Sequence, residues 1–94
     1  GPCIAQGLDY ARADGIRVEG LVNGAVRQSS STKELIFTIP FLIEYISTNM
    51  TLLPGDIIST GTPSGVGPLK AGDRVTITVE NVGELTNTVR SIAN

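Results

Sequence analysis

The sequence has 94 residues, of which 40% are hydrophobic, with a formal net charge of −2 and a pI of about 4.9. This length suits one domain, and the hydrophobic share is too high for a disordered chain. Lys and Arg form no cluster, and no apolar run approaches the ~20 residues of a membrane helix, so the sequence favours neither a nucleic-acid partner nor a membrane partner.

The inventory of reactive side chains is short. Cys3 is the only cysteine, so no internal disulfide can form, and we expect a buried thiol, which is compatible with a reducing cytosol. Histidine is absent, and no two Asp or Glu are adjacent or separated by a single residue. These absences exclude close-spaced local metal motifs and a His-based triad. The chain opens with residues 1–4, GPCI, without an initiator Met or a signal-peptide pattern, and we expect it to begin inside a longer protein.

Residues 16–28 have the pattern of a β-hairpin. Apolar and charged residues alternate over 16–19, as in a half-buried strand. Asn23-Gly24 suits a two-residue type I′ turn, because both residues tolerate positive φ. We expect residues 29–32, which are polar, to form a loop. With a two-residue turn at Asn23-Gly24, the expected cross-strand residue pairs of the hairpin are Leu21 with Val26, Gly20 with Arg27, and Glu19 with Gln28.

Residues 39–50 predict one helix, because their apolar positions fall on a single stripe at helical spacing. Thr38 is a suitable N-cap, and Pro40 suits the first turn, where its missing N–H costs no hydrogen bond. We expect the stripe to pack in the core. It consists of Ile39, Leu42, Ile43, Ile46 and Met50.

Three turns follow. Residues 53–56, Leu-Pro-Gly-Asp, are typical of a type II turn and lead into residues 57–59, Ile-Ile-Ser. A second Gly-Asp turn at 70–73 leads into residues 74–80, which alternate as the clearest strand of the sequence. A turn at 81–84 leads into a last strand over 85–92. The sequence therefore predicts a β-rich α+β fold with mostly antiparallel strands and one packed helix, in one domain or part of one.

The segment over residues 56–67, DIISTGTPSGVG, is rich in glycine and hydroxyl groups. Val66 stands where a Walker loop needs its second glycine, and Lys70 stands where a dinucleotide fingerprint needs its third. Two interpretations remain: a plain turn, or a concave nest of hydroxyls and unhindered N–H groups that binds an anion. The hydroxyls belong to Thr60, Thr62 and Ser64.

Three segments together resemble the C-terminal part of the fumarylacetoacetate hydrolase family, and the resemblance covers residues 1–90. In order, they are NGAVRQSSSTKELIFTIPFLIEYIS, MTLLPGDIISTGTPSGVGPLKAGD and RVTITVENVGELTNTV. The block DIISTGTPSGVGP is the most distinctive. The resemblance implies a mixed β-sandwich roll, a homo-dimer and a cytoplasmic enzyme, with aromatic compound catabolism as its setting.

The resemblance also implies a chemistry. Members of the family hydrolyse a C–C bond, decarboxylate or isomerise small oxo-diacids and acylpyruvates through an enolate, which Mg²⁺ or Mn²⁺ stabilises. The metal ligands of the family, a Glu-x-Glu pair and an Asp, and its catalytic Lys precede the Gly-Pro motif, which here is Gly1-Pro2. We therefore assign no catalytic or metal-binding residue within residues 1–94. We expect the chain alone to be inactive. We also expect it to function together with the remainder of the catalytic domain, as its partner.

Four residues match substrate-site positions of the family. Thr62 would donate its hydroxyl to a carboxylate or oxo group of a small oxo-acid, and Gly61 would leave the ligand room. Arg27 and Gln28 match an Arg-Gln pair near the active site, although Arg27 could equally be a solvated strand residue. The residues at 31–32 depart from the usual Asn-Thr, so they receive no role.

A second hypothesis is a stand-alone, β-rich binding or structural module without catalysis. The Gly-Asp turn at 70–73 followed by an alternating strand occurs in many small β-barrels. The two hypotheses differ in what precedes Gly1: an upstream Glu-x-Glu, Asp and Lys would indicate the enzyme, and a start codon would indicate the module.

Overall fold

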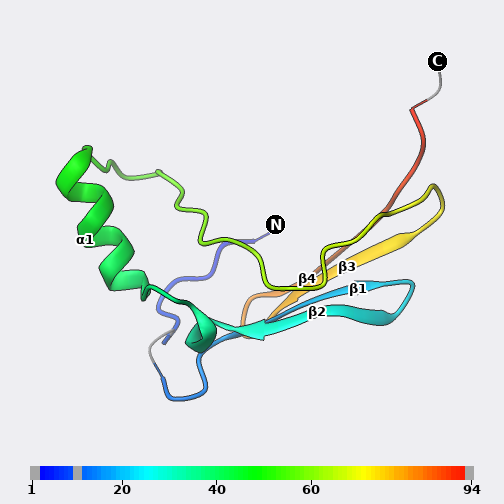
Figure 1. Cartoon of the computed structure of the whole chain (residues 1–94), viewed down its shortest axis with the longest axis horizontal. Coiled ribbons are helices and arrows are strands. Elements are labelled where there is room, and N and C mark those ends of the chain that lie inside the picture. The colour runs from blue at the N-terminus through cyan, green and yellow to red at the C-terminus, as the bar shows by residue number, and fades with distance from the viewer. Residues whose placement is uncertain (1–2, 10–11, 93–94) are drawn as a thin grey trace.

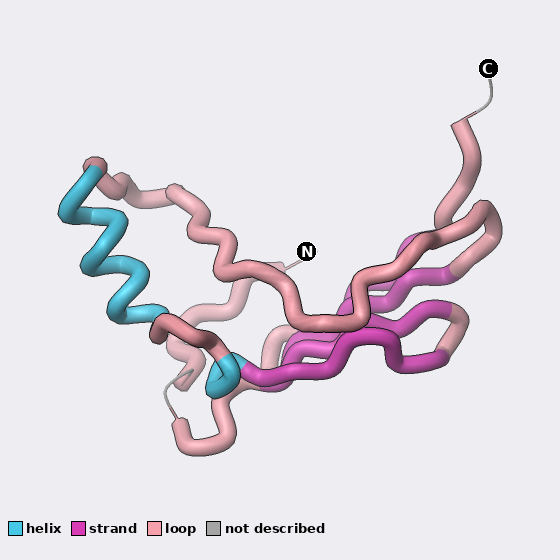
Figure 2. The backbone as a smooth tube through the Cα atoms, viewed as in Figure 1, coloured by secondary structure: helices cyan, strands magenta, loops and turns pink. Residues whose placement is uncertain are grey.

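The structure is a computed structural model that describes residues 3–9 and 12–92. Across these residues it contains four strands in one antiparallel sheet of order β2-β1-β3-β4, one 3-10 helix and one α-helix. Helix α1 stands away from the sheet, and a long loop returns from its C-terminus to β3 (Figures 1 and 2). The elements are β1 (Arg17–Val22), β2 (Ala25–Ser31), η1 (Thr32–Glu34), α1 (Ile39–Asn49), β3 (Arg74–Val79) and β4 (Gly83–Thr88).

The β1–β2 hairpin forms with the expected turn, in which Asn23 and Gly24 have φ of 52° and 81°. The pairing of Leu21 with Val26 is confirmed. The other two pairs are wrong, because a β-bulge shifts the register at Gly20/Leu21. Arg27 is the extra residue. Past it, Gly20 pairs with Gln28, and Glu19 pairs with Ser29.

The loop expected over residues 29–32 is also wrong. Residues 29–31 complete β2 by pairing with residues 17–19 of β1, and Thr32 begins η1. Backbone pairing with β1 decides this segment, since polar side chains are tolerated on an edge strand.

The register of β1, β3 and β4 brings most of their apolar side chains to the same face of the sheet. Among the described residues, however, the only buried hydrophobic side chains are Ile16 and Val22. Ile77 and Leu85 remain 41% and 36% exposed. The described residues therefore cover this face only in part. Its apolar members are Val18, Val22, Val75, Ile77, Val79 and Leu85.

Helix α1 begins as expected: the Thr38 hydroxyl accepts a hydrogen bond from Phe41 N at 3.3 Å, and a proline lies in the first turn. The helix ends at Asn49, one residue early. The expectation that its stripe packs in a core is wrong, because no residue of α1 is buried and Met50 is 63% exposed. Figures 1 and 2 give the reason, since no strand lies along the helix.

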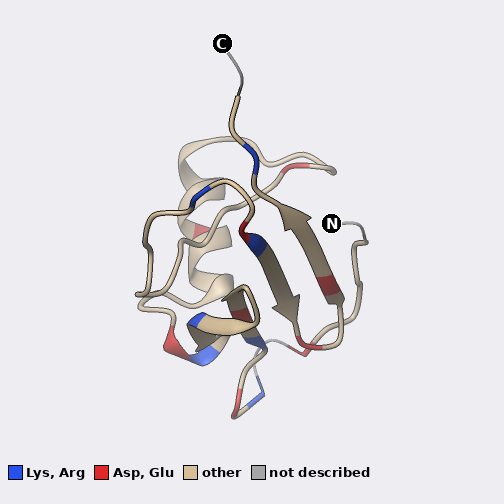
Figure 3. Ribbon diagram, turned by 90° about the vertical axis from the view of Figure 1, so that its right-hand side faces the viewer, with Lys and Arg blue, Asp and Glu red and all other residues tan. Residues whose placement is uncertain are grey.

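Cys3, expected to be buried, is exposed, and its thiol donates to the Val82 carbonyl at 3.3 Å. Within the described part of the chain, no helix is both long and apolar enough to cross a membrane. Basic and acidic positions are interspersed along the ribbon in Figure 3.

The turns at 53–56 and 70–73 share one construction. In the first, Asp56 N donates to Leu53 O at 3.0 Å and Gly55 has a φ of 94°, which confirms the type II turn. In each turn the Asp carboxylate also accepts from the first backbone N–H, at 2.8 Å in the first and 3.0 Å in the second. Residues 57–59 do not form a strand. The last strand is expected over residues 85–92; β4 instead begins two residues earlier, at Gly83, and ends four residues earlier, at Thr88.

Candidate functional site at the glycine loop

The glycine loop, residues 60–69, lies against the edge strand β2. Gln28 makes the first connection: its Nε2 donates to Thr62 Oγ1 at 2.8 Å and to Pro63 O at 2.9 Å. A primary amide has two hydrogens, so these two bonds use both. The structure thus brings together Gln28 and Thr62, which are 34 positions apart in the sequence.

Arg27 makes the second connection, because its Nη1 donates to Pro68 O at 2.8 Å. The residue is exposed, but its guanidinium holds the loop as well as meeting solvent. Gly65 lies directly on the Arg27 carbonyl, where a Cβ would collide with the oxygen, and its φ is 104°. Only glycine fits this contact. The sequence pattern gave no sign of it, because the bulge that presents Arg27 is a property of strand pairing.

Thr60, Gly61, Thr62 and Pro63 form one wall of a cavity of about 480 Å³. The opposite walls come from the end of β2, from η1 and from the start of α1. Gly61 has a φ of 104°, and nothing lies within 4 Å of the place where its Cβ would be. The volume suits a small organic molecule. Hydroxyl groups at the wall alternate with apolar side chains, which include Val18, Phe37, Ile39 and Leu42.

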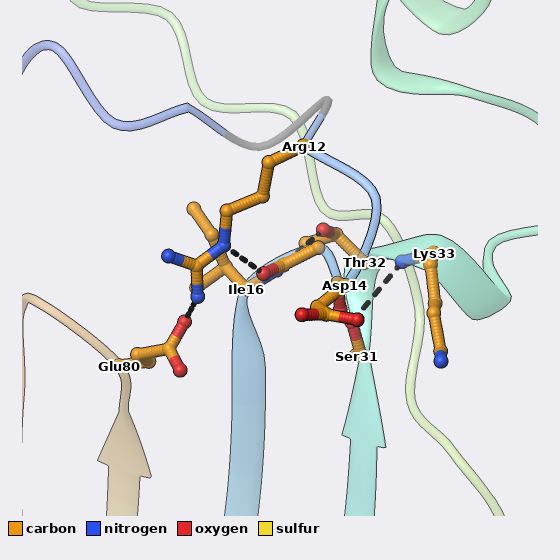
Figure 4. A network of polar contacts seen from close by, with 8 residues as sticks. Arg12, Asp14, Ile16, Ser31, Thr32, Lys33 and Glu80 are labelled. Atoms are coloured by element: carbon orange, nitrogen blue, oxygen red, sulfur yellow. Dashed lines mark hydrogen bonds and ion pairs between the residues drawn. The ribbon is translucent and has the colours of Figure 1, made fainter.

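The η1 end of this cavity is braced by a polar network (Figure 4). Ile16 N donates to Thr32 Oγ1 at 2.9 Å, and Ser31 Oγ donates to Asp14 O at 2.5 Å. A Cβ on Gly15 would collide with both hydroxyls. The residues at 31–32, to which sequence analysis assigned no role, therefore hold the start of β1 against the end of β2.

A second part of the network reaches β3. Arg12 forms an ion pair with Glu80, and its Nε donates to Gly15 O at 2.7 Å (Figure 4). Glu80 N in turn donates to Arg17 O at 2.9 Å. These contacts fix the segment before β1 on the sheet.

Carboxylates in the described ranges do not fit a metal site. No group of three or more His, Cys, Asp or Glu among residues 3–9 and 12–92 could hold an ion. Asp73 is the one buried carboxylate among the described residues, and its role is structural: Lys70 N and Asn23 Nδ2 each donate to it at 3.0 Å. These two hydrogen bonds, the backbone one first, lower the pKa of Asp73 below its usual value of 3.8.

Comparison with known proteins identifies the family. A sequence model described as "Fumarylacetoacetate (FAA) hydrolase C-terminal" matches residues 1–90. The oxaloacetate tautomerase YisK of Bacillus subtilis is 44% identical over 96 residues, covering 95% of this chain and 32% of YisK. The 4-hydroxyphenylacetate degradation bifunctional isomerase/decarboxylase of Salmonella dublin is 43% identical, covering 95% of this chain and 21% of that enzyme.

Solved structures agree. A 5-carboxymethyl-2-hydroxymuconate delta-isomerase from Mycobacterium smegmatis has a TM-score of 0.90 at 49% identity, covering 100% of this chain and 36% of its own. A maleylpyruvate hydrolase from Sphingobium, solved with manganese (II) and pyruvate, has a TM-score of 0.84 at 42% identity, covering 96% of this chain and 34% of its own.

The chain spans only part of the length of these relatives, from 21% of the Salmonella dublin enzyme to 37% of a relative from Methanocaldococcus jannaschii. The match nevertheless extends over almost the whole chain, at residues 1–90. The relatives named for an activity are hydrolases, isomerases, tautomerases and decarboxylases. The chain therefore belongs to the fumarylacetoacetate hydrolase family of enzymes.

Proposed function

We propose that residues 1–94 are a single-domain fragment, the C-terminal part of a catalytic domain that acts on small oxo-diacids or acylpyruvates. The reaction is C–C bond hydrolysis, decarboxylation or isomerisation through an enolate. The observation that carries the proposal is the hydrogen bond from Gln28 to Thr62 at the wall of the 480 Å³ cavity. Two relatives support the substrate class: one is named for oxaloacetate, and another was solved with pyruvate.

In this proposal Thr62 binds the substrate. Its oxygen accepts from Gln28, so its own O–H is available to donate to a carboxylate or oxo group in the cavity. A hydrogen bond to a charged acceptor is stronger than one to a neutral acceptor. Gly61 leaves the approach to this hydroxyl open. Arg27 takes part less directly, by holding the far end of the loop at Pro68.

The divalent ion, Mg²⁺ or Mn²⁺, would be held by residues outside 1–94. The described residues lack a suitable cluster of donors, and the manganese in the Sphingobium relative supports a divalent ion for the family. When bound, the ion would supply Lewis-acid stabilisation of negative charge on the substrate. The residues of this chain would contribute the hydroxyl, the apolar walls and the exclusion of water.

The rest of the catalytic domain would cover the exposed apolar surfaces. Ile43 and Met50 of the α1 stripe are 43% and 63% exposed, and the sheet leaves Ile77 41% exposed. Contiguous apolar surface of this kind marks an interface. We propose that the upstream part of the chain completes a mixed β-sandwich roll over these surfaces, in a cytoplasmic homo-dimer.

The test is Thr62→Val in the full-length protein, which keeps the β-branched shape and removes the hydroxyl. We expect kcat/KM on oxaloacetate or an acylpyruvate, with Mn²⁺, to fall about ten- to a hundredfold, as for loss of a hydrogen bond worth about 1.5–3 kcal/mol. Thr60→Val, on the same cavity wall, should cost less. Thr51→Val, exposed and outside the cavity lining, is the matched control. Equal, small losses in all three variants would refute a substrate role for Thr62.

A further inference from the structure

We propose that Gln28 is a positioning residue that fixes the direction of the Thr62 hydroxyl. Its amide holds the Thr62 oxygen toward β2 and so leaves the Thr62 proton pointing to the cavity. This inference rests on the proposed function, because it specifies how the substrate-binding hydroxyl is prepared. It also changes the role of Gln28, which sequence analysis placed among the substrate-binding residues.

The hydrogen-bond partners settle which way the amide faces. A backbone carbonyl can only accept, so the Gln28 atom 2.9 Å from Pro63 O must be the nitrogen. The same nitrogen lies 2.8 Å from Thr62 Oγ1, so that oxygen must accept as well. Thr62 therefore has its proton left for another acceptor. Without Gln28, the hydroxyl could rotate and present a lone pair to the ligand.

The sheet is built to hold this amide. The bulge at Arg27 places Gln28 opposite Gly20, on the apolar face of the sheet. A Cβ built on Gly20 would lie 3.4 Å from Gln28 Oε1, so the side chain crosses the space that a glycine leaves. Gln28 is half-buried, and its two bonds go to consecutive residues of the loop. The donor is thus fixed by β2 at one end and by the loop at the other.

Gln28→Glu in the full-length protein tests the inference, because a carboxylate cannot donate. The introduced carboxylate would face Pro63 O and would draw the Thr62 proton to itself. We expect kcat/KM at neutral pH to fall about tenfold or more, with Mn²⁺ and oxaloacetate as the probe. We expect partial recovery as the pH falls toward about 5, because the protonated carboxyl regains one donor. The wild-type profile should lack this recovery.

Two comparisons separate this role from a general structural one. Asn87→Asp makes the same chemical change on β4, away from the loop, and should follow the wild-type profile. In a Thr62→Val background, Gln28→Glu should cost less than about threefold further, because the hydroxyl it acts through is already absent. Fully additive losses, or a Gln28→Glu profile parallel to that of Asn87→Asp, would overturn the inference.

Failure of the proposed function has a different signature. If the wild-type protein turns over no oxo-acid, the proposed function fails, and the inference is decided by NMR of labelled threonine methyl groups. The Thr62 signal, identified by its loss in Thr62→Val, should move with pH in Gln28→Glu and stay fixed in wild type and in Asn87→Asp. A Thr62 signal that does not move in Gln28→Glu overturns the inference.

Discussion

The sheet and helix α1 are stabilised in different ways, although both are formed by clear sequence signals. Hydrogen bonds between residues far apart tie the sheet together, such as the bond from Asn23 Nδ2 to Asp73 at 3.0 Å. The side-chain bonds within α1 join residues three or four apart, such as Thr48 Oγ1 to Glu44 O at 2.7 Å. No residue of α1 is buried. Local signals therefore determine that a helix forms, and the described residues leave its surface unburied.

The largest expected effect is complete loss of activity when residues 1–94 are separated from the rest of the protein. We expect the isolated chain to show no turnover of oxaloacetate or acylpyruvates with Mg²⁺ or Mn²⁺, because its described residues offer no metal site. An assay beside the full-length protein checks this. Metal-dependent turnover well above buffer would mean that the sheet alone is sufficient.

The next effect concerns association of the isolated chain. We expect it to self-associate through the apolar stripe of α1, so Ile43→Lys combined with Met50→Lys should shift sedimentation toward the monomer. Ser47→Lys combined with Thr48→Lys adds the same two charges at polar positions of the helix and should shift it less. A dilution-stable monomer with a cooperative melt would contradict the comparison and favour the stand-alone module.

A smaller effect is expected at the β1–β2 turn, where Asn23 bonds the start of β3. Asn23→Ala should destabilise the full-length protein by about 1–3 kcal/mol, because Asn23 bonds Asp73 and Arg74 N and has a φ of 52°. Asn23→Gly keeps the favourable φ and removes only the side-chain bonds, so its loss should be smaller. Melting in denaturant measures both variants, and equal losses would show that the backbone conformation contributes nothing.

The smallest effect is a dependence of stability on pH. The pKa of Asp73 is lowered in the folded state by hydrogen bonds from Lys70 N and Asn23. As the pH falls, Asp73 of the unfolded chain therefore binds its proton before Asp73 of the folded chain does. The contribution of Asp73 to the stability of the fold is full above the unfolded pKa of 3.8 and is lost as the pH falls through the lower pKa of the folded state. Thermal melts of wild type and Asp73→Asn between about pH 5 and about pH 2 check this, since the variant lacks the titrating group. Parallel curves would contradict it.

Much of this fold could be predicted from local sequence. The Asn23-Gly24 turn, the Thr38 cap and the turn at 53–56 each depend on neighbouring residues, and each is confirmed. Residues 29–31 were misassigned because cross-strand pairing outweighs their polar composition. The core role expected for the α1 stripe was wrong because burial requires a partner that no local pattern identifies.

The candidate site divides in the same way. The family resemblance points to Gln28 and Thr62 separately, and no rule of spacing predicts that their side chains meet. The meeting depends on the bulge at Arg27, which the regular hairpin register does not predict. The glycine at 65 was visible in the sequence, but its reason, contact with the Arg27 carbonyl, comes only from the fold.

The contact between Gly65 and Arg27 has a consequence for solubility. Strand β2 is an edge of the sheet, and an open edge is a template on which a second chain can add a strand. The glycine loop lies along this edge and is held there by Arg27 and Gln28. Because the loop covers the Arg27 carbonyl on this edge, we expect it to hinder edge-to-edge aggregation as well. A second chain that pairs with this edge would first have to displace the loop and break the hydrogen bonds of Arg27 and Gln28.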